Sequence, residues 1–199
     1  MDWNERYNND DMPWDKGAGT PVLAELLKIT PQYFQPSANA LVPGCGLGHD
    51  VAMLHHAGIN AKGLDISETA LEMARKAHPE LGEVWIMDDL FDMSDQAAAY
   101  DLIWEHTCYC AIPPEKRSDY ARSVFDLLKA NAYFAGVFFT DTGQPPEVGP
   151  PFSTTRDDVL ENFNRMFHLV WEGKPSQNYP GRENCEWVMI WQKPIQELS

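Results

Sequence analysis

A glycine-rich turn between two short apolar runs constrains the fold of this chain more than any other feature. The first run ends at Pro43 and leads into residues 44–48, which read GCGLG, and the second run ends at Asp65. Glycines allow a sharp turn and a close approach of the backbone to a ligand. A carboxylate about 20 residues further on is the spacing of a βαβ unit that binds a nucleoside, in which the acid accepts both ribose hydroxyls. The pattern predicts two parallel strands, a crossover helix and a nucleoside site.

The residues around the turn narrow the class of ligand. Gly44, Gly46 and Gly48 follow a G-x-G-x-G pattern rather than the dinucleotide pattern, and no lysine followed by serine or threonine completes a P-loop. Asp50, near the start of the next helix, would repel a pyrophosphate. A cationic or zwitterionic ligand fits better, and S-adenosylmethionine (SAM), with its sulfonium and amino group, is such a ligand. A plain tight turn in an α/β sheet is the alternative.

Composition and charge indicate one globular domain, residues 1–199, without a membrane-spanning segment. The formal net charge of −15 would repel nucleic acid and anionic membranes, so neither is expected as a partner. The four cysteines, Cys45, Cys108, Cys110 and Cys185, form no Cys-x-x-Cys motif, so we expect no metal and a reduced protein. The polar, acidic N-terminus differs from a signal peptide. We therefore expect a cytoplasmic location.

Strand-like and helix-like segments alternate along most of the chain, which predicts a mostly parallel sheet covered by helices on both faces. The ranges that read as strands are 38–43, 60–65, 83–88, 100–105, 132–140, 165–172 and 185–192. The ranges that read as helices are 20–29, 48–57, 67–78, 114–129 and 155–163. No helical pattern separates the last two strands, so we expect an antiparallel hairpin there. The fold class is an α/β three-layer sandwich with a seven-stranded sheet.

Acidic residues also follow the third predicted strand. Asp89 could accept a hydrogen bond from the exocyclic amine of adenine, and the backbone nitrogen of Leu90 could donate to the ring. Alternatively, Asp88 and Asp89 only cap the following turn. Because ligands of parallel sheets bind at the carboxyl ends of strands, we favour Asp89 as the adenine contact.

The fourth predicted strand ends in Glu105 and His106, whose side chains point in opposite directions, so only one of them readily faces the cleft. His106 is a candidate catalytic residue beside the methyl acceptor, as a base or as a neutral hydrogen-bond donor. An ordinary structural histidine is the alternative. Cys108 and Cys110 are expected to be packing residues, because nothing in the sequence would activate a thiol there. Tyr109 is also expected to be a packing residue, and it is a candidate substrate contact as well.

Three further residues could complete a cleft. Trp14 lies in a polar N-terminal segment and could fold over the cleft as a lid, where its ring would stabilise a sulfonium. Alternatively, it anchors the arm to the core. Phe152, in a Gly-Pro-Pro-Phe segment, could form a second wall. Arg182 could reach the site from the opposite rim, or form a surface pair with Glu183.

Several motifs, in order along nearly the whole chain, resemble those of class I SAM-dependent methyltransferases of the thiopurine S-methyltransferase superfamily. Within it, the chain is more similar to the plant halide and thiocyanate methyltransferases. The matching segments are PWDKGAGTP at 13–21, VPGCGLGHD at 42–50, GLDIS at 63–67, DLF at 89–91, YDLI at 100–103, CAIPPEKR at 110–117 and GPPF at 149–152.

Two segments depart from the family's pattern. Glu105 and His106 stand where thiopurine enzymes have Asp-Arg, so an anion-binding arginine is missing there. Residues 129–132, which read KANA, replace the usual Lys-Pro-Gly-Gly turn. The first departure weakens the case for a thiopurine substrate, and the second changes only a turn.

The resemblance implies the class I methyltransferase fold, SAM as cofactor and S-adenosylhomocysteine (SAH) as product. It implies that Trp14 and residues 44–48 hold the methionine part of SAM, Asp65 the ribose and Asp89 the adenine. It also implies an N-terminal arm, about residues 1–30, that closes over the cofactor. The remaining expected cofactor contacts are Ile66, Leu90 and Glu105.

The expected function is methyl transfer from SAM to a small, soft nucleophile, with the sulfur of a thiol or sulfide as first choice. Displacement at a sulfonium requires alignment and the exclusion of water, and His106 would help a neutral thiol lose its proton. Halide, thiocyanate and thiopurine methylation are alternatives within this class. Outside it stand a non-catalytic SAM-binding protein and an NAD-dependent dehydrogenase. A small-molecule acceptor is the expected partner, and a monomer the expected state, with a weak dimer as the alternative.

Overall fold

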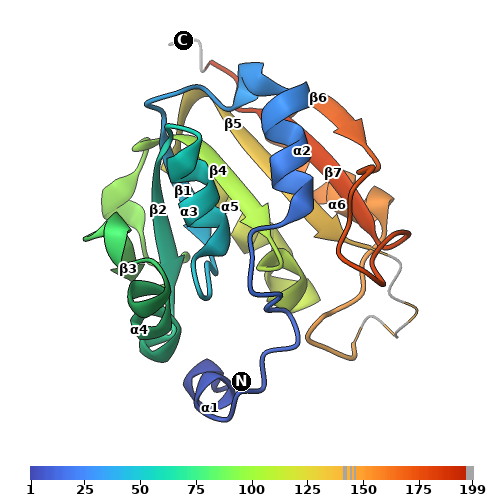
Figure 1. Ribbon diagram of the computed structural model, residues 1–199. Helices are drawn as coiled ribbons and strands as arrows, with labels where there is room; N and C mark the ends of the chain where they lie inside the picture. The colour runs from blue at the N-terminus through green and yellow to red at the C-terminus, as the bar shows by residue number, and fades with distance from the viewer. Residues whose placement is uncertain (141–142, 144, 146, 196–199) are drawn as a thin grey trace.

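A seven-stranded sheet forms the centre of the computed structural model, which describes residues 1–140, 143, 145 and 147–195 (Figure 1). The strands are β1 (Asn39–Pro43), β2 (Asn60–Asp65), β3 (Trp85–Met87), β4 (Tyr100–His106), β5 (Leu128–Phe139), β6 (His168–Gly173) and β7 (Glu186–Gln192). Their order across the sheet is β3-β2-β1-β4-β5-β7-β6. Strands β1 to β5 run parallel, and β7 pairs antiparallel with both β5 and β6. The predicted fold class is confirmed.

Helices cover both faces of the sheet. They are α1 (Trp3–Asn8), α2 (Pro21–Ile29), α3 (His49–His56), α4 (Glu68–Ala77), α5 (Arg117–Leu127) and α6 (Arg156–Phe163). Buried residues of α2, α3 and α4 form one apolar cluster with one face of the sheet, and those of α5 and α6 form a second cluster with the other face. Along β4, Leu102 and Trp104 join the first cluster and Ile103 joins the second, because successive side chains of a strand point to opposite faces. The result is a three-layer sandwich.

The junction between α5 and β5 differs from the predicted elements. The helix predicted over 114–129 ends at Leu127, and residues 128–131 already belong to β5. Residues far away in the sequence donate hydrogen bonds to the backbone carbonyls of this junction. Ala99 N–H donates to Leu127 O (3.0 Å), and Lys193 Nζ donates to Leu128 O (2.8 Å). Long-range hydrogen bonds therefore outweigh the local helical pattern.

Helix α1 is absent from the predicted elements. Asp2 caps it, since its Oδ1 accepts a hydrogen bond from Glu5 N–H (3.1 Å). An acidic cap followed three residues later by Glu is a helix-start signal that could have identified it. The helix docks on the start of α4, where Ser67 Oγ donates to Asn4 Oδ1 (2.8 Å).

The order of the strands creates a topological switch between β1 and β4. Strands β2 and β3 lie on one side of β1, whereas β4 and β5 lie on the other. Ligands of such sheets bind beyond the carboxyl ends of the strands at this point. The glycine turn follows β1 there, and α1 lies beyond the same edge of the sheet (Figure 1). In the part of the chain that the structure describes, every helix is too short or too polar to cross a membrane.

Candidate active site

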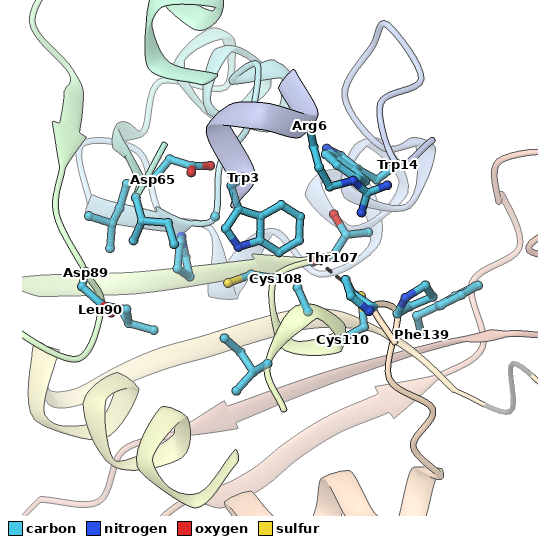
Figure 2. A pocket seen from close by; sticks show the side chains of 18 of the residues that line it. Trp3, Arg6, Trp14, Asp65, Asp89, Leu90, Thr107, Cys108, Cys110 and Phe139 are labelled. Atoms are coloured by element: carbon cyan, nitrogen blue, oxygen red, sulfur yellow. Dashed lines mark hydrogen bonds between the residues drawn. The ribbon is translucent and has the colours of Figure 1, made fainter. Parts of the chain in front are cut away.

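A cavity of about 350 Å³ lies at the carboxyl ends of β1, β2 and β3. Its wall comes from α1 and the arm after it, from the loops after these strands and β4, and from the loop before β7 (Figure 2). The predicted site residues that line it are Trp14, Gly44, Asp65, Ile66, Asp89, Leu90 and Arg182. Segments far apart in the sequence therefore meet where a ligand was expected.

The backbone of the glycine turn holds Asp65 in place at the end of β2. Its Oδ2 accepts a hydrogen bond from Gly46 N–H (2.9 Å), and its Oδ1 accepts one from Ser67 N–H (2.9 Å). Burial raises the pKa of this carboxyl, although the hydrogen bonds act to lower it. Each carboxylate oxygen keeps a lone pair for a further donor, such as the vicinal hydroxyls of a ribose.

The loop after β3 brings Asp89 and Leu90 to the same cavity. Asp89 Oδ1 accepts a hydrogen bond from Phe91 N–H (3.0 Å), so the carboxylate caps the turn and lines the cavity at once. Asp88 also lines the cavity, and its Oδ1 accepts a hydrogen bond from Asp89 N–H (2.8 Å). The two interpretations of this acidic pair, a turn cap and an adenine contact, are therefore compatible.

Helix α1 supplies a wall that the sequence analysis missed. Trp3, Arg6 and Tyr7 line the cavity together with Trp14 (Figure 2). The centre of the Trp14 ring lies 5.5 Å from the centre of the Trp3 ring and 5.7 Å from that of the Tyr7 ring, and both pairs pack edge to face. The Arg6 guanidinium lies 4.5 Å from the centre of the Trp14 ring. These contacts pack the arm against α1 at the cavity, so Trp14 anchors the arm, and its part as a lid stays a prediction.

A second, smaller cavity of about 60 Å³ shares Trp14 and Gly44 with the first. Gly46, His106 and Tyr179 also line it. The smaller cavity therefore lies against the glycine turn, where the resemblance places the methionine part of the cofactor.

A buried carboxylate fixes the His106 ring at this second cavity. His106 Nδ1 lies 2.9 Å from Asp50 Oδ2, and Asp50 also accepts hydrogen bonds from Trp104 Nε1–H (2.8 Å) and Thr20 N–H (2.7 Å). Burial acts to raise the pKa of Asp50, but the facing histidine and these hydrogen bonds lower it below its usual value. An ionised Asp50 favours a proton on Nδ1. Nε2 is buried and has no hydrogen-bond partner among the described residues, and in the neutral ring with a proton on Nδ1 it is an acceptor.

This position differs from the acceptor-side position predicted for His106. Cys108 lines the large cavity, Thr107 lines both cavities, and His106 lines only the small one. The hydrogen bond to Asp50 draws the ring toward α3 and away from the large cavity. His106 thus shares the small cavity with the glycine turn.

Glu105 and Tyr109 lie beneath the cavities rather than in their walls. Glu105 is 1% exposed, and its carboxylate accepts hydrogen bonds from Cys108 N–H (2.9 Å), Tyr109 N–H (2.7 Å) and the Tyr120 hydroxyl. Burial raises the pKa of Glu105, although these bonds act to lower it. Tyr109 is equally buried, and the Arg117 guanidinium lies 4.9 Å from the centre of its ring. Glu105 therefore shapes the loop after β4 and Tyr109 packs in the core, whereas the cofactor contact of Glu105 and the substrate contact of Tyr109 stay predictions.

Gly48 and Phe152 also lie outside the walls of both cavities. Gly48 begins α3 with a φ of 78°, and a Cβ there would come 2.3 Å from the Trp85 ring, so this glycine permits close packing rather than ligand contact. Phe152 N–H donates to Cys110 O (2.7 Å), and residues 150–151 form the wall that was predicted for Phe152.

Thiols, an aromatic ring and a cation form the remaining wall. Cys108 and Cys110, expected to be packing residues only, line the cavity with Phe139 (Figure 2). Burial raises the pKa of both thiols, that of Cys110 to about 12, so both stay protonated at neutral pH. The Arg182 guanidinium lies 5.3 Å from the centre of the Phe139 ring, and its Nη1 lies 3.4 Å from Glu186 Oε1. Arg182 therefore places a positive charge beside soft, polarisable groups.

The chain is similar to known methyltransferases. A family model described as thiopurine S-methyltransferase matches residues 1–180. The thiocyanate methyltransferase 1 of Arabidopsis thaliana is 30% identical over 198 residues, which cover 96% of this chain and 84% of that protein. The probable thiol methyltransferase 2 of the same plant is 33% identical over 151 residues, which cover 72% of this chain and 65% of that protein.

Solved structures share the fold. The 1,6-didemethyltoxoflavin-N1-methyltransferase of Burkholderia thailandensis, with 1,6-didemethyltoxoflavin and SAH bound, superposes with a TM-score of 0.77 at 18% identity. The match covers 96% of this chain and 85% of that one. The class I methyltransferase architecture expected from the sequence is therefore confirmed.

Proposed function

Because the chain belongs to the thiopurine S-methyltransferase family, we propose that it transfers a methyl group from SAM to a small, soft nucleophile, preferably the sulfur of a thiolate or hydrosulfide. One observation carries the proposal. A single cavity holds Asp65 and Asp89 on one side, and Cys110 and Phe139 on the other (Figure 2). Arg182 lines the same cavity beside Phe139. The acids suit ribose and adenine, whereas a guanidinium beside polarisable groups suits a small anion.

The residues at the glycine turn fit the methionine part of SAM. Gly44 lines both cavities and Gly46 lines the small one. A Cβ at Gly44 would come 2.9 Å from the Cys108 side chain, and one at Gly46 would come 3.0 Å from the Tyr7 hydroxyl, so glycine lets the turn pack closely against two residues of the cavity wall. The unpartnered Nε2 of His106 would accept a hydrogen bond from the cofactor's ammonium group. We assign His106 to the cofactor rather than to acid–base chemistry on the acceptor.

Orientation and exclusion of water are the tasks of the protein. When bound, SAM supplies an electrophilic methyl group on a sulfonium. Trp3 and Trp14 cover the cavity from the arm, and Arg182 attracts and orients an anionic acceptor. A thiolate or hydrosulfide needs no general base. The raised pKa of Cys110 keeps this wall thiol protonated, so it competes poorly as a nucleophile.

Thiocyanate methylation is the second candidate function. The Arabidopsis thaliana relative that matches 96% of this chain is a thiocyanate methyltransferase. Thiocyanate is also a soft monovalent anion, and Arg182 would attract it as it would attract a thiolate. The acceptor preference therefore has to be measured.

The proposed enzyme is cytoplasmic and monomeric and acts on a small molecule, and its composition fits the location and the partner. The net charge of −15 disfavours nucleic acid and anionic membranes as partners. The free cysteines suit a reducing compartment. Cell fractionation and light scattering would test the location and the monomeric state.

A mass-spectrometric screen with methyl-labelled SAM tests the proposed function. The acceptors are sulfide, small thiols, thiocyanate, iodide and a thiopurine, and we expect sulfide or a small thiol to be methylated fastest. Preferential turnover of thiocyanate or iodide would favour the second candidate class. Binding of SAM without product from any acceptor would refute the enzymatic function.

Substitution of Arg182 tests its part in the reaction. Loss of one charge-assisted hydrogen bond, about 1.5–3 kcal/mol, predicts that Arg182→Met raises the KM for the acceptor at least ~10-fold. The KM for SAM should stay within about two-fold, because the cofactor contacts are untouched. Arg165→Met is the matched control, since Arg165 pairs with Glu161 at the surface with 71% of its side chain exposed. An unchanged acceptor KM would remove Arg182 from the proposal.

A further inference from the structure

We propose that Tyr179 is a positioning residue that couples closure of the N-terminal arm over the cofactor to the placement of Arg182 at the acceptor. Tyr179 lies in the loop between β6 and β7 and lines the small cavity, whereas Arg182, three residues later, lines the large one. The coupling makes cofactor and acceptor strengthen each other's binding. This inference rests on the proposed function for the identity of the acceptor.

The Tyr179 side chain binds the arm directly. Its hydroxyl donates to Ala18 O (2.5 Å), and Ala18 also lines the small cavity. Burial and the charge of Asp50 raise the pKa of Tyr179 to about 12, which keeps the hydroxyl protonated as a donor. Ala18 lies between Trp14, which covers the cavities, and Thr20, whose N–H donates to Asp50 (2.7 Å). A change in the position of the arm therefore reaches Tyr179 through one hydrogen bond.

The same residue holds the acceptor-side arginine. The Arg182 guanidinium lies 5.6 Å from the centre of the Tyr179 ring, and Arg182 N–H donates to Tyr179 O (3.0 Å). The Tyr179 ring also lies beside the His106 ring. The centres of the two rings are 6.3 Å apart, and their planes form an angle of 24°. Tyr179 thus touches the arm, the histidine assigned to the cofactor and the arginine assigned to the acceptor.

The rest of the loop is anchored independently of Tyr179. Glu25 of α2 accepts hydrogen bonds from Ser176 N–H (3.0 Å), Ser176 Oγ (2.8 Å) and Gln177 N–H (3.2 Å). This anchor keeps the first part of the loop on α2, and Glu186 accepts hydrogen bonds from Asn178 Nδ2 (2.7 Å) and Arg182 Nη1 (3.4 Å) in the second part. Removal of the Tyr179 hydroxyl should therefore shift the loop relative to the arm without unfolding it. An effect of the Tyr179 hydroxyl on the coupling of the two ligands can therefore be separated from an effect on the stability of the loop.

Tyr179→Phe is the test variant, because it keeps the ring and removes only the bond to Ala18. Tyr33→Phe is the matched control, since Tyr33 packs on Tyr133 and lines neither cavity. We expect Tyr179→Phe to raise the KM for the acceptor about five-fold, the effect of one hydrogen bond, with kcat within about two-fold. Tyr33→Phe should have the same KM for the acceptor and the same kcat as the wild type.

The effect of the acceptor on cofactor binding gives the decisive readout. If the cofactor strengthens binding of the acceptor, linkage requires the acceptor to strengthen binding of the cofactor by the same factor. The Kd for SAH is measured by calorimetry with and without saturating thiocyanate or sulfide. We expect the acceptor to tighten SAH binding about five-fold in the wild type and in Tyr33→Phe, and not in Tyr179→Phe. A ratio that is the same in all three proteins would overturn the coupling.

Hydrogen exchange separates failure of this inference from failure of the proposed function. SAH alone should slow amide exchange over residues 178–185 in the wild type but not in Tyr179→Phe. If no acceptor is methylated and this protection still depends on the hydroxyl, the proposed function fails and the link between arm and loop stands. If an acceptor is methylated but both proteins show equal protection and equal KM, the coupling is refuted and the function stands.

Discussion

Replacement of Asp50 by asparagine tests the contact that joins the arm, α3 and β4. Asp50 is 8% exposed. Its carboxylate accepts hydrogen bonds from three groups: Thr20 N–H at 2.7 Å, Trp104 Nε1–H at 2.8 Å and His106 Nδ1–H at 2.9 Å. An asparagine of nearly the same size offers one acceptor oxygen and adds two N–H donors. At least one of the three donors therefore loses its acceptor and faces an N–H group.

The size of the effect follows from this count. A buried donor without an acceptor costs about 1–3 kcal/mol, and hydrogen bonds to a charged group contribute about 1.5–3 kcal/mol each. We expect Asp50→Asn to lower the free energy of unfolding by about 2–4 kcal/mol. Asp101→Asn is the control, because Asp101 pairs with Lys129 at the surface, with side chains 39% and 40% exposed. Its cost should stay below about 1 kcal/mol.

The dependence on pH gives a second check. The pKa of Asp50 is lowered in the folded protein, so the unfolded chain binds this proton more readily than the folded one. Its contribution is therefore present above the unfolded pKa of about 3.9 and is lost as the pH falls through the lower, folded pKa. The difference between wild type and Asp50→Asn should narrow below about pH 4.

Urea denaturation, followed by circular dichroism and tryptophan fluorescence, measures both effects. The series covers pH 7 down to the lowest pH at which the wild type remains folded. A loss below about 1 kcal/mol at pH 7 would refute the reasoning, since at least one buried donor would then be paired in another way. A loss that does not change with pH would show that the charge of Asp50 contributes nothing.

Three further predictions concern the cofactor side and the wall of the large cavity. Asp65→Asn should weaken SAH binding in calorimetry roughly 100-fold, because two charge-assisted hydrogen bonds to the ribose are lost, and a change below about three-fold would contradict the ribose assignment. Gly48→Ala should destabilise the protein by about 2–4 kcal/mol in urea denaturation, from a positive φ and a 2.3 Å approach to the Trp85 ring; a neutral variant would mean that the ring moves freely. Cys110, with a pKa of about 12, should react with iodoacetamide at pH 8 at least ~10-fold more slowly than N-acetylcysteine, as peptide mapping can measure.

Most elements of the fold could be predicted because their signals are local. Alternating and helical periodicities and turn residues located all seven strands and five helices to within a few residues, with exceptions at α1 and at the junction after Leu127. The junction depends on a hydrogen bond from Lys193, which is far away in the sequence. No local pattern contains that information.

The candidate site could be predicted in part. The residues after β1, β2 and β3 line the large cavity as expected, because parallel strands bring their carboxyl ends to one edge. The roles of Glu105, His106 and Tyr109 could not be read from their positions. Each depends on a partner elsewhere in the chain: Tyr120 for Glu105, Asp50 for His106, and Asn162, whose Nδ2 donates to the Tyr109 hydroxyl.

The sequence by itself determined the class of fold, the place of the cofactor turn and the family, since these follow from periodicity, glycine spacing and motifs in a fixed order. Only the tertiary structure decided which side chains face a cavity. At the end of a strand, successive side chains must point to opposite faces of the sheet. The final orientation of a side chain such as that of His106 depends on a buried partner, here Asp50. The same holds for Tyr179, which meets the arm only in the folded chain, because its hydrogen bond to Ala18 crosses more than a hundred residues of sequence.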